Sequence, residues 1–152
     1  MIRDDLKTAL VSAMKSGDKA GTQTLRMISS AIKNRDIELR TASTKPDDDA
    51  LVTDVLQKMI KQRRESVTMY EQGGRAELVA IESAEIAVIE RFLPQQMSEE
   101  EAKTAIAVLI AEAGASSMKD MGKVMTLVKE RHATSIEPAR ASALVKALLS
   151  GA

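Results

Sequence analysis

Apolar residues in the N-terminal part of the chain recur at alternating three- and four-residue spacing, which returns to one helix face every seven residues. Three consecutive stretches follow this seam: Leu25, Ile28, Ile32, Arg35 and Leu39; Val52, Leu56, Met59, Arg63, Ser66 and Tyr70; and Leu78, Ile81, Glu85, Val88 and Phe92. Each seam contains one charged residue. Because burying an ion is costly unless it is paired, each seam charge is predicted to be half of an internal ion pair or a site kept for a ligand.

Helix-breaking residues divide this part into four predicted helices. The helices are an amphipathic segment on Ile2, Leu6, Leu10 and Met14, then about 22–43, about 48–72 and about 75–93. Gly17 and Gly21 end the first, the polar run Thr41–Asp49 follows the second, and Gly73-Gly74 follows the third. The short connection at Gly73-Gly74 predicts that the last two helices pair antiparallel.

Pro94 to Met97 form the best domain boundary. Pro94 disfavours helix at Leu93, and Ser98 with Glu101 three residues later forms a capping box that starts a new helix. Three shorter helices are predicted after it, at about 99–113, 118–131 and 137–149. We therefore expect an all-α protein with an N-terminal long-helix domain of about four helices, 1–93, and a C-terminal three-helix bundle, 97–152.

Composition excludes several classes of chemistry. The 22 basic and 22 acidic residues balance, whereas proteins that coat nucleic acid generally show a basic excess. Without cysteine and with His132 alone, the chain has no thiol nucleophile, thiolate metal site or histidine cluster, and we expect no metal or cofactor. No cationic leader or membrane-length apolar run occurs, which predicts a soluble, cytoplasmic protein.

The seam charges have a natural internal explanation. In an antiparallel pair that turns near Gly73-Gly74, Arg63 comes level with Glu85. In the pair that turns near residue 45, Arg35 comes level with Asp54. Two structural ion pairs are therefore predicted, and the alternative is that Arg63 is kept open for an anion.

Two sets of surface cations are candidate phosphate contacts. Arg26, Lys33 and Arg40 are spaced by seven and form a stripe beside the seam of the second helix, while four cations lie between Lys58 and Arg64 without an acid. Contacts of this kind are electrostatic and salt-sensitive. The alternative is that these charges are simply solvated helix faces.

A smaller cluster lies in the C-terminal part. Lys119 and Lys123 are one helical turn apart and bracket a helix start, and Gly122 between them permits close approach of another backbone. One interpretation is that a phosphate binds there. The other is that Gly122 only allows the helix to pack closely on its neighbour.

Several motifs resemble the YqeY family. They are Leu25-Arg26 with Ala31-Ile32-Lys33-Asn34 and Glu38-Leu39-Arg40; Lys61-Gln62-Arg63-Arg64-Glu65-Ser66; Glu82 with Glu85; Phe92-Leu93-Pro94 with Gln96; and Asp120-Met121-Gly122-Lys123-Val124-Met125. The resemblance covers nearly the whole chain. The chain departs from the family pattern at Arg131–Pro138, where a small glycine-rich turn is common, and at Phe92, where tyrosine is common.

The resemblance implies an all-helical protein whose C-terminal domain is similar to the tail of the GatB component of the glutamine-dependent aspartyl/glutamyl-tRNA amidotransferase. That tail helps to hold tRNA, so the leading hypothesis is a non-catalytic tRNA-associated adaptor that uses Lys119, Gly122, Lys123, Arg26, Lys33 and Arg40. One alternative is an accessory subunit of a carbon–nitrogen ligase with glutamine as amido-N donor. The other is a helical protein–protein interaction module with a translation-related partner. The sequence does not predict an oligomeric state.

Overall fold

The computed structural model describes residues 1–151, which contain seven α-helices, two short 3-10 turns and no strand. The predicted all-α class is confirmed. The helices are α1 (Ile2–Ser16), α2 (Lys19–Glu38), α3 (Asp48–Gln72), α4 (Ala76–Glu90), α5 (Glu99–Ala113), α6 (Met121–His132) and α7 (Pro138–Leu149). The 3-10 turns are η1 (Leu39–Thr41) and η2 (Met118–Asp120). The chain divides into two compact units, one from Met1 to Leu93 and the other from Pro94 onward.

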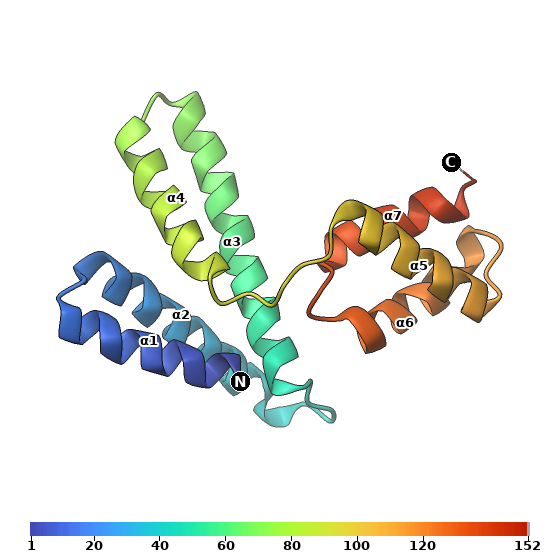
Figure 1. Cartoon of the computed structure of the whole chain (residues 1–152), viewed down its shortest axis with the longest axis horizontal. Helices are drawn as coiled ribbons and strands as arrows, with labels where there is room; N and C mark the ends of the chain where they lie inside the picture. Colours follow the sequence, from blue (N-terminus) through green and yellow to red (C-terminus); the bar gives the residue numbers. More distant parts are fainter. Residues whose placement is uncertain (152) are drawn as a thin grey trace. The chain divides into compact units, whose positions relative to one another are not determined.

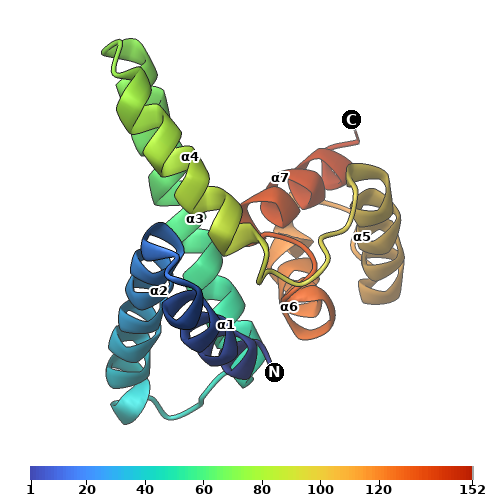
Figure 2. The same cartoon turned by 60° about the vertical axis from the view of Figure 1, so that its left-hand side comes forward.

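The first unit consists of two helical hairpins, α1 with α2 and α3 with α4 (Figures 1 and 2). Their shared core is formed mainly by fully buried aliphatic side chains, among them Ile28 of α2, Val52 and Leu56 of α3 and Ile89 of α4. The predicted seams face this core up to Ile32 in α2 and Met59 in α3, while the later seam positions Ser66 and Tyr70 are not buried. In α4 the seam is only partly correct, since Ile81 is 54% exposed and Ile89, outside the predicted seam, is buried.

The core of this unit is confined to one half of the long hairpin. All buried residues of α3 lie between Leu51 and Ile60, and the only buried residue of α4 is Ile89 at its far end. The other end of the hairpin, near Gly73-Gly74, extends beyond α1 and α2 (Figure 1). Residues 61–72 of α3 thus pack against α4 without a buried side chain of their own.

Local chemistry explains where the helices begin and end. Gly17 ends α1 with φ +75°, a conformation that favours glycine, and the Asp18 carboxylate then accepts a hydrogen bond from the Gly21 amide at 2.9 Å. The prediction that Gly21 also ends the first helix is wrong, because Gly21 lies in the first turn of α2. In a continued helix the ring of Pro94 would clash with the carbonyl group of Glu90, four residues earlier. Helix α4 accordingly stops at Glu90.

The second unit is built from α5, α6 and α7 around a separate core. Ile106, Val124 and Val145 are fully buried there. Ser98 caps α5 by accepting from the Glu101 amide at 3.2 Å, at the predicted capping position. The side chain of Gln96 donates to the Thr134 carbonyl at 2.8 Å, which fixes the segment before α5. Among the described residues, no helix combines the length and the apolar character that a membrane span requires.

Candidate nucleic-acid interface

Most arginine side chains are occupied by partners within the chain. Of the ten arginines, six form ion pairs: Arg3, Arg35, Arg63, Arg64, Arg75 and Arg131. Arg140 donates to the Met97 carbonyl, and Arg91 lies over the Phe92 ring at 5.7 Å from its centroid. Within residues 1–151 this leaves Arg26 and Arg40 as the two arginines without an ion-pair, hydrogen-bond or ring partner. Both belong to the predicted basic stripe.

Arg63 and Glu85 form an internal ion pair between α3 and α4. Arg63 Nε donates to Glu85 Oε2 at 2.9 Å, and the two side chains are 13% and 20% exposed. Arg63 Nη1 also donates to the Met59 carbonyl at 3.3 Å, while Nη2 lies 3.7 Å from the sulfur of Met27 on α2. The guanidinium is thus held by three helices, and its donors point into the unit, so Arg63 is not a site open to an anion.

The predicted pair between Arg35 and Asp54 is wrong. Arg35 Nη1 donates to Glu38 Oε2 at 2.9 Å, and Asp54 pairs with Lys58 at 3.1 Å. Each charge therefore finds a partner three or four residues away on its own helix. A groove lined by Arg35, Lys58 and others lies between these parts of α2 and α3.

Arg3 holds together the starts of two helices and the end of a third. Its guanidinium donates to Asp36 of α2 at 2.9 and 3.1 Å and to Asp48 of α3 at 2.8 Å. The hydrogen bond from Arg3 is the main cause that lowers the pKa of Asp48, and both carboxylates raise the pKa of Arg3. Sequence reasoning missed this cluster, because Arg3 lies outside every apolar seam and its partners are more than thirty residues away.

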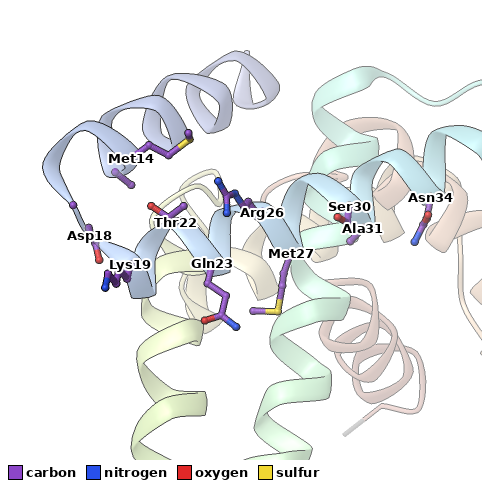
Figure 3. A pocket seen from close by; sticks show the side chains of 12 residues that line it. Met14, Asp18, Lys19, Thr22, Gln23, Arg26, Met27, Ser30, Ala31 and Asn34 are labelled. Atoms are coloured by element: carbon purple, nitrogen blue, oxygen red, sulfur yellow. The ribbon is translucent and has the colours of Figure 1, made fainter.

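A groove of the first unit follows one face of α2. It has a volume of about 920 Å³ and is bounded at one end by Ala13, Met14 and Gly17 of the first hairpin. The α2 residues that line it lie on successive turns of one face: Lys19, Thr22, Gln23, Arg26, Met27, Ser30, Ala31 and Asn34 (Figure 3). The groove therefore has a mixed lining, in which apolar side chains such as Met14 and Met27 lie beside polar ones and two cations, Lys19 and Arg26.

This face of α2 contains almost no negative charge. Asp36 and Glu38 are the only acids within α2, and they are bound by Arg3 and Arg35. Asp18 lies at the end of the groove, where its carboxylate caps the helix by accepting from the Gly21 amide. Arg26 and Lys19 thus face solvent without a competing carboxylate partner along the groove.

The predicted basic stripe is only partly retained. Arg26 lines the groove, and Lys33, seven residues later on α2, is exposed beside it. The predicted helix 22–43 ends at Glu38, and Arg40 lies in the tighter turn η1. Because a 3-10 turn has three residues per turn, Arg40 does not continue the seven-residue spacing.

The cluster in the second unit is exposed but not purely cationic. Lys119 lies in η2 and Lys123 in the first turn of α6, and both side chains are exposed. Between them, Asp120 accepts hydrogen bonds from the amides of Ser116 and Ser117 at 3.0 and 3.4 Å. These bonds are the main cause that lowers the pKa of Asp120, with a smaller effect from Lys123, so its negative charge is maintained.

Gly122 does not serve helix packing. A Cβ atom placed there would meet nothing within 4 Å, so the interpretation that Gly122 allows a close contact with a neighbouring helix is wrong. Lys123 also lines a shallow hollow with Glu112, Ala113, Thr126 and Leu127. The backbone at Gly122 therefore remains open to an external partner.

Four residues of the α2 groove were missed by sequence reasoning: Lys19, Gln23, Ser30 and Asn34. Their signal was present, because they share with Arg26 a spacing of three or four residues that places all of them on one helix face. A polar face of this kind is ordinary on any amphipathic helix, so only the structure distinguishes it from a plain solvated surface.

Comparison with known proteins identifies the family. The sequence model described as Yqey-like protein matches residues 3–149. Curated relatives share the name "altered inheritance of mitochondria protein 41, mitochondrial". The Eremothecium gossypii protein is 36% identical over 107 residues, which are 68% of this chain and 57% of that protein. The Lachancea thermotolerans protein is 34% identical over 91 residues, which are 60% of this chain and 47% of that protein. A Saccharomyces cerevisiae protein is 30% identical over 95 residues, which are 62% of this chain and 48% of that protein.

These relatives correct one expectation. Each is named as a mitochondrial protein, which contradicts the cytoplasmic location expected from the sequence. That expectation depended on finding no leader sequence. The matched part of this chain spans only about half the length of these relatives, so the start of the chain is not a guide to its location.

Proposed function

Because the chain belongs to the family of Yqey-like proteins, we propose that it is a non-catalytic adaptor that associates with tRNA through salt-sensitive contacts to phosphates. The observation that carries this proposal is the pairing of the arginines. In residues 1–151 the two arginines left without a partner, Arg26 and Arg40, both come from the basic stripe. Partners within the chain hold the other arginines in place, whereas unpaired guanidinium groups are available for phosphate.

The second unit would supply a further contact. We propose that the two units act as separate domains, with the three-helix unit similar to the tRNA-holding tail of the amidotransferase. Lys119, Lys123 and the open backbone at Gly122 are its candidate contacts. Since Asp120 keeps a negative charge between the two lysines, we expect this unit to contribute less to phosphate binding than the α2 face does.

We assign no reaction to the chain by itself. The sequence has no cysteine for a glutaminase and one histidine, His132, which lies at the end of α6, where a cation suits the helix dipole. If the protein takes part in carbon–nitrogen ligation, we expect it to do so as an accessory subunit. Release of ammonia from glutamine by the purified chain would contradict this view.

Titration with total tRNA at low and moderate salt tests the proposal. We expect binding that weakens steeply as salt rises, because contacts to phosphates release counterions. A Lys119→Ala/Lys123→Ala variant and an Arg26→Ala/Lys33→Ala variant should each bind more weakly. The absence of salt-dependent binding by the parent chain would contradict the adaptor function.

An interaction module for another protein is the second candidate. It is favoured by two large apolar side chains on the long hairpin, Met69 at 70% exposure and Ile81 at 54%. A pull-down from native lysate with and without nuclease separates the two functions. Capture of RNA that nuclease abolishes supports the adaptor, while capture of a protein that survives nuclease supports the module.

A further inference from the structure

We propose that the groove-lining face of α2 is a binding surface for the backbone of double-stranded RNA, read by its shape and its 2′-hydroxyl groups and not by its base sequence. This inference rests on the proposed association with tRNA and names the surface and the class of RNA structure that it fits. It goes beyond the basic stripe, because it includes the amide and hydroxyl side chains that share the groove with Arg26.

The polar and charged side chains of this face form one continuous row along α2, called the ridge below. Lys19, Gln23, Arg26, Ser30 and Asn34 follow one another at steps of three or four residues, and all of them line the groove. Figure 3 shows them projecting from successive turns of α2. A helix rises 1.5 Å per residue, so the ridge is about 22 Å long. A row of that length can lie along a groove of a nucleic acid.

The chemistry of the face matches a sugar–phosphate backbone. Lys19 and Arg26 supply positive charge for phosphates, and neither forms an ion pair within residues 1–151. Gln23, Ser30 and Asn34 lie between and beside them, and their side chains both donate and accept hydrogen bonds. The RNA 2′-hydroxyl also donates and accepts, and the wide, shallow minor groove of duplex RNA displays it.

The face lacks what recognition of unpaired bases requires. Single-stranded RNA is generally held by stacking of its bases on aromatic rings. The aromatic residues of the chain are Tyr70 and Phe92, and neither lines the groove. The observations therefore favour base-paired RNA over single strands.

The row from Lys19 to Asn34 contains two cations and no acid, so its net charge is positive. Asp36 and Glu38 pair with Arg3 and Arg35, so Asp18, which caps α2 at the end of the groove, is the one acid that lines it. An acidic protein surface would meet the same positive charge and would accept hydrogen bonds from Gln23, Ser30 and Asn34, but ionised carboxylates cannot donate to the oxygens of these side chains as a 2′-hydroxyl does. Polyglutamate is therefore a useful competitor in the test.

The experiment compares four probes on the full chain: an RNA stem-loop, the DNA stem-loop of the same sequence, unstructured oligouridylate and polyglutamate. We expect the RNA stem-loop to bind most tightly. A Lys19→Ala/Arg26→Ala variant should bind it about tenfold more weakly, with a salt dependence reduced by about two phosphate contacts. A Gln23→Ala/Asn34→Ala variant should keep the salt dependence and lose the preference for RNA over DNA.

Lys7→Ala/Lys45→Ala is the matched control, because it removes two exposed cations of the same unit that lie outside the groove. Equal effects of this control and of Lys19→Ala/Arg26→Ala would overturn the inference, as would equal or tighter binding of oligouridylate, polyglutamate or DNA. If the parent binds total tRNA and the α2 variants bind it with the same affinity, the assignment of the α2 surface is wrong and the adaptor function stands. If the parent binds no tRNA, both are wrong. Circular dichroism of each variant verifies that it is folded.

Discussion

Arg63 of α3 and Glu85 of α4 meet through one hydrogen bond of 2.9 Å between Nε and Oε2, with both side chains mostly buried. The same guanidinium reaches the Met59 carbonyl and the sulfur of Met27, so it links α2, α3 and α4. Pairs of this kind add little net stability, but they leave a costly unpaired charge when one partner is removed. The charge in the apolar seam is therefore a structural tie between helices.

Replacing Glu85 tests this tie. We expect Glu85→Ala to lower the free energy of unfolding by about 2–3 kcal/mol, because the Arg63 charge would remain partly buried without its carboxylate. Urea denaturation of the parent and the variant measures the difference. Glu90→Ala is the matched control, since it breaks the exposed pair with Arg64 and should cost less than about 1 kcal/mol. Equal stability of Glu85→Ala and the parent would return Arg63 to the candidate functional sites.

The Arg3 cluster predicts a dependence of stability on pH. Since the hydrogen bond from Arg3 lowers the pKa of Asp48 in the folded state, Asp48 stabilises the fold above its ordinary pKa of about 3.8. This contribution is lost as the pH falls through the lower, folded-state pKa. We expect Asp48→Asn to be less stable than the parent by about 1 kcal/mol at pH 7, because the group is partly exposed. Denaturation curves at pH 7 and pH 2 should show the difference shrinking at the lower pH, and a constant difference would contradict the prediction.

Thr53 presents a buried hydroxyl without a partner. Its side chain is fully buried in α3, and among the described residues its Oγ1 forms no hydrogen bond. We expect Thr53→Val to raise the free energy of unfolding by about 1 kcal/mol, because a methyl group would replace the unsatisfied hydroxyl. Thr24 is the control, since it is also buried but donates to the Ala20 carbonyl at 3.1 Å. Thr24→Val should therefore be destabilising, and the same sign for both variants would refute the argument.

Gly122 allows stability to be separated from binding. Gly122→Ala should raise the free energy of unfolding by about 0.5 kcal/mol, because the added Cβ meets open space and alanine favours the helix. If the RNA backbone approaches Gly122, the same variant should bind total tRNA more weakly. Thermal unfolding and tRNA titration of one protein sample measure both effects. Unchanged tRNA affinity would remove Gly122 from the interface, whatever its effect on stability.

Much of the helical fold could be predicted from the sequence, because the signals there were local. The spacing of Leu25, Ile28 and Ile32 fixes the buried face of α2, and Ser98 marks the start of α5. In α4 the same method chose Ile81 and missed Ile89. That helix is apolar around most of its circumference, so spacing alone does not select the face that packs.

The charges were harder to place than the helices. Arg63 and Glu85 come level because a short turn sets the register of α3 and α4. Arg35 and Asp54 are separated by a longer polar connection, and each was satisfied more easily on its own helix. The groove along α2 depends on how α1 packs beside it, which is a long-range arrangement that one polar helix face does not reveal.

The uneven burial of α3 has a dynamic consequence. Backbone amides near Val52 and Leu56 open only when the core of the unit unfolds, so their hydrogen exchange should be slow. Beyond Ile60 the helix has no buried side chain, and exchange should become faster toward Gly73 within the same unbroken helix. The hairpin therefore frays from its turn inward, and a single long helix combines a rigid anchor with a tip that opens locally.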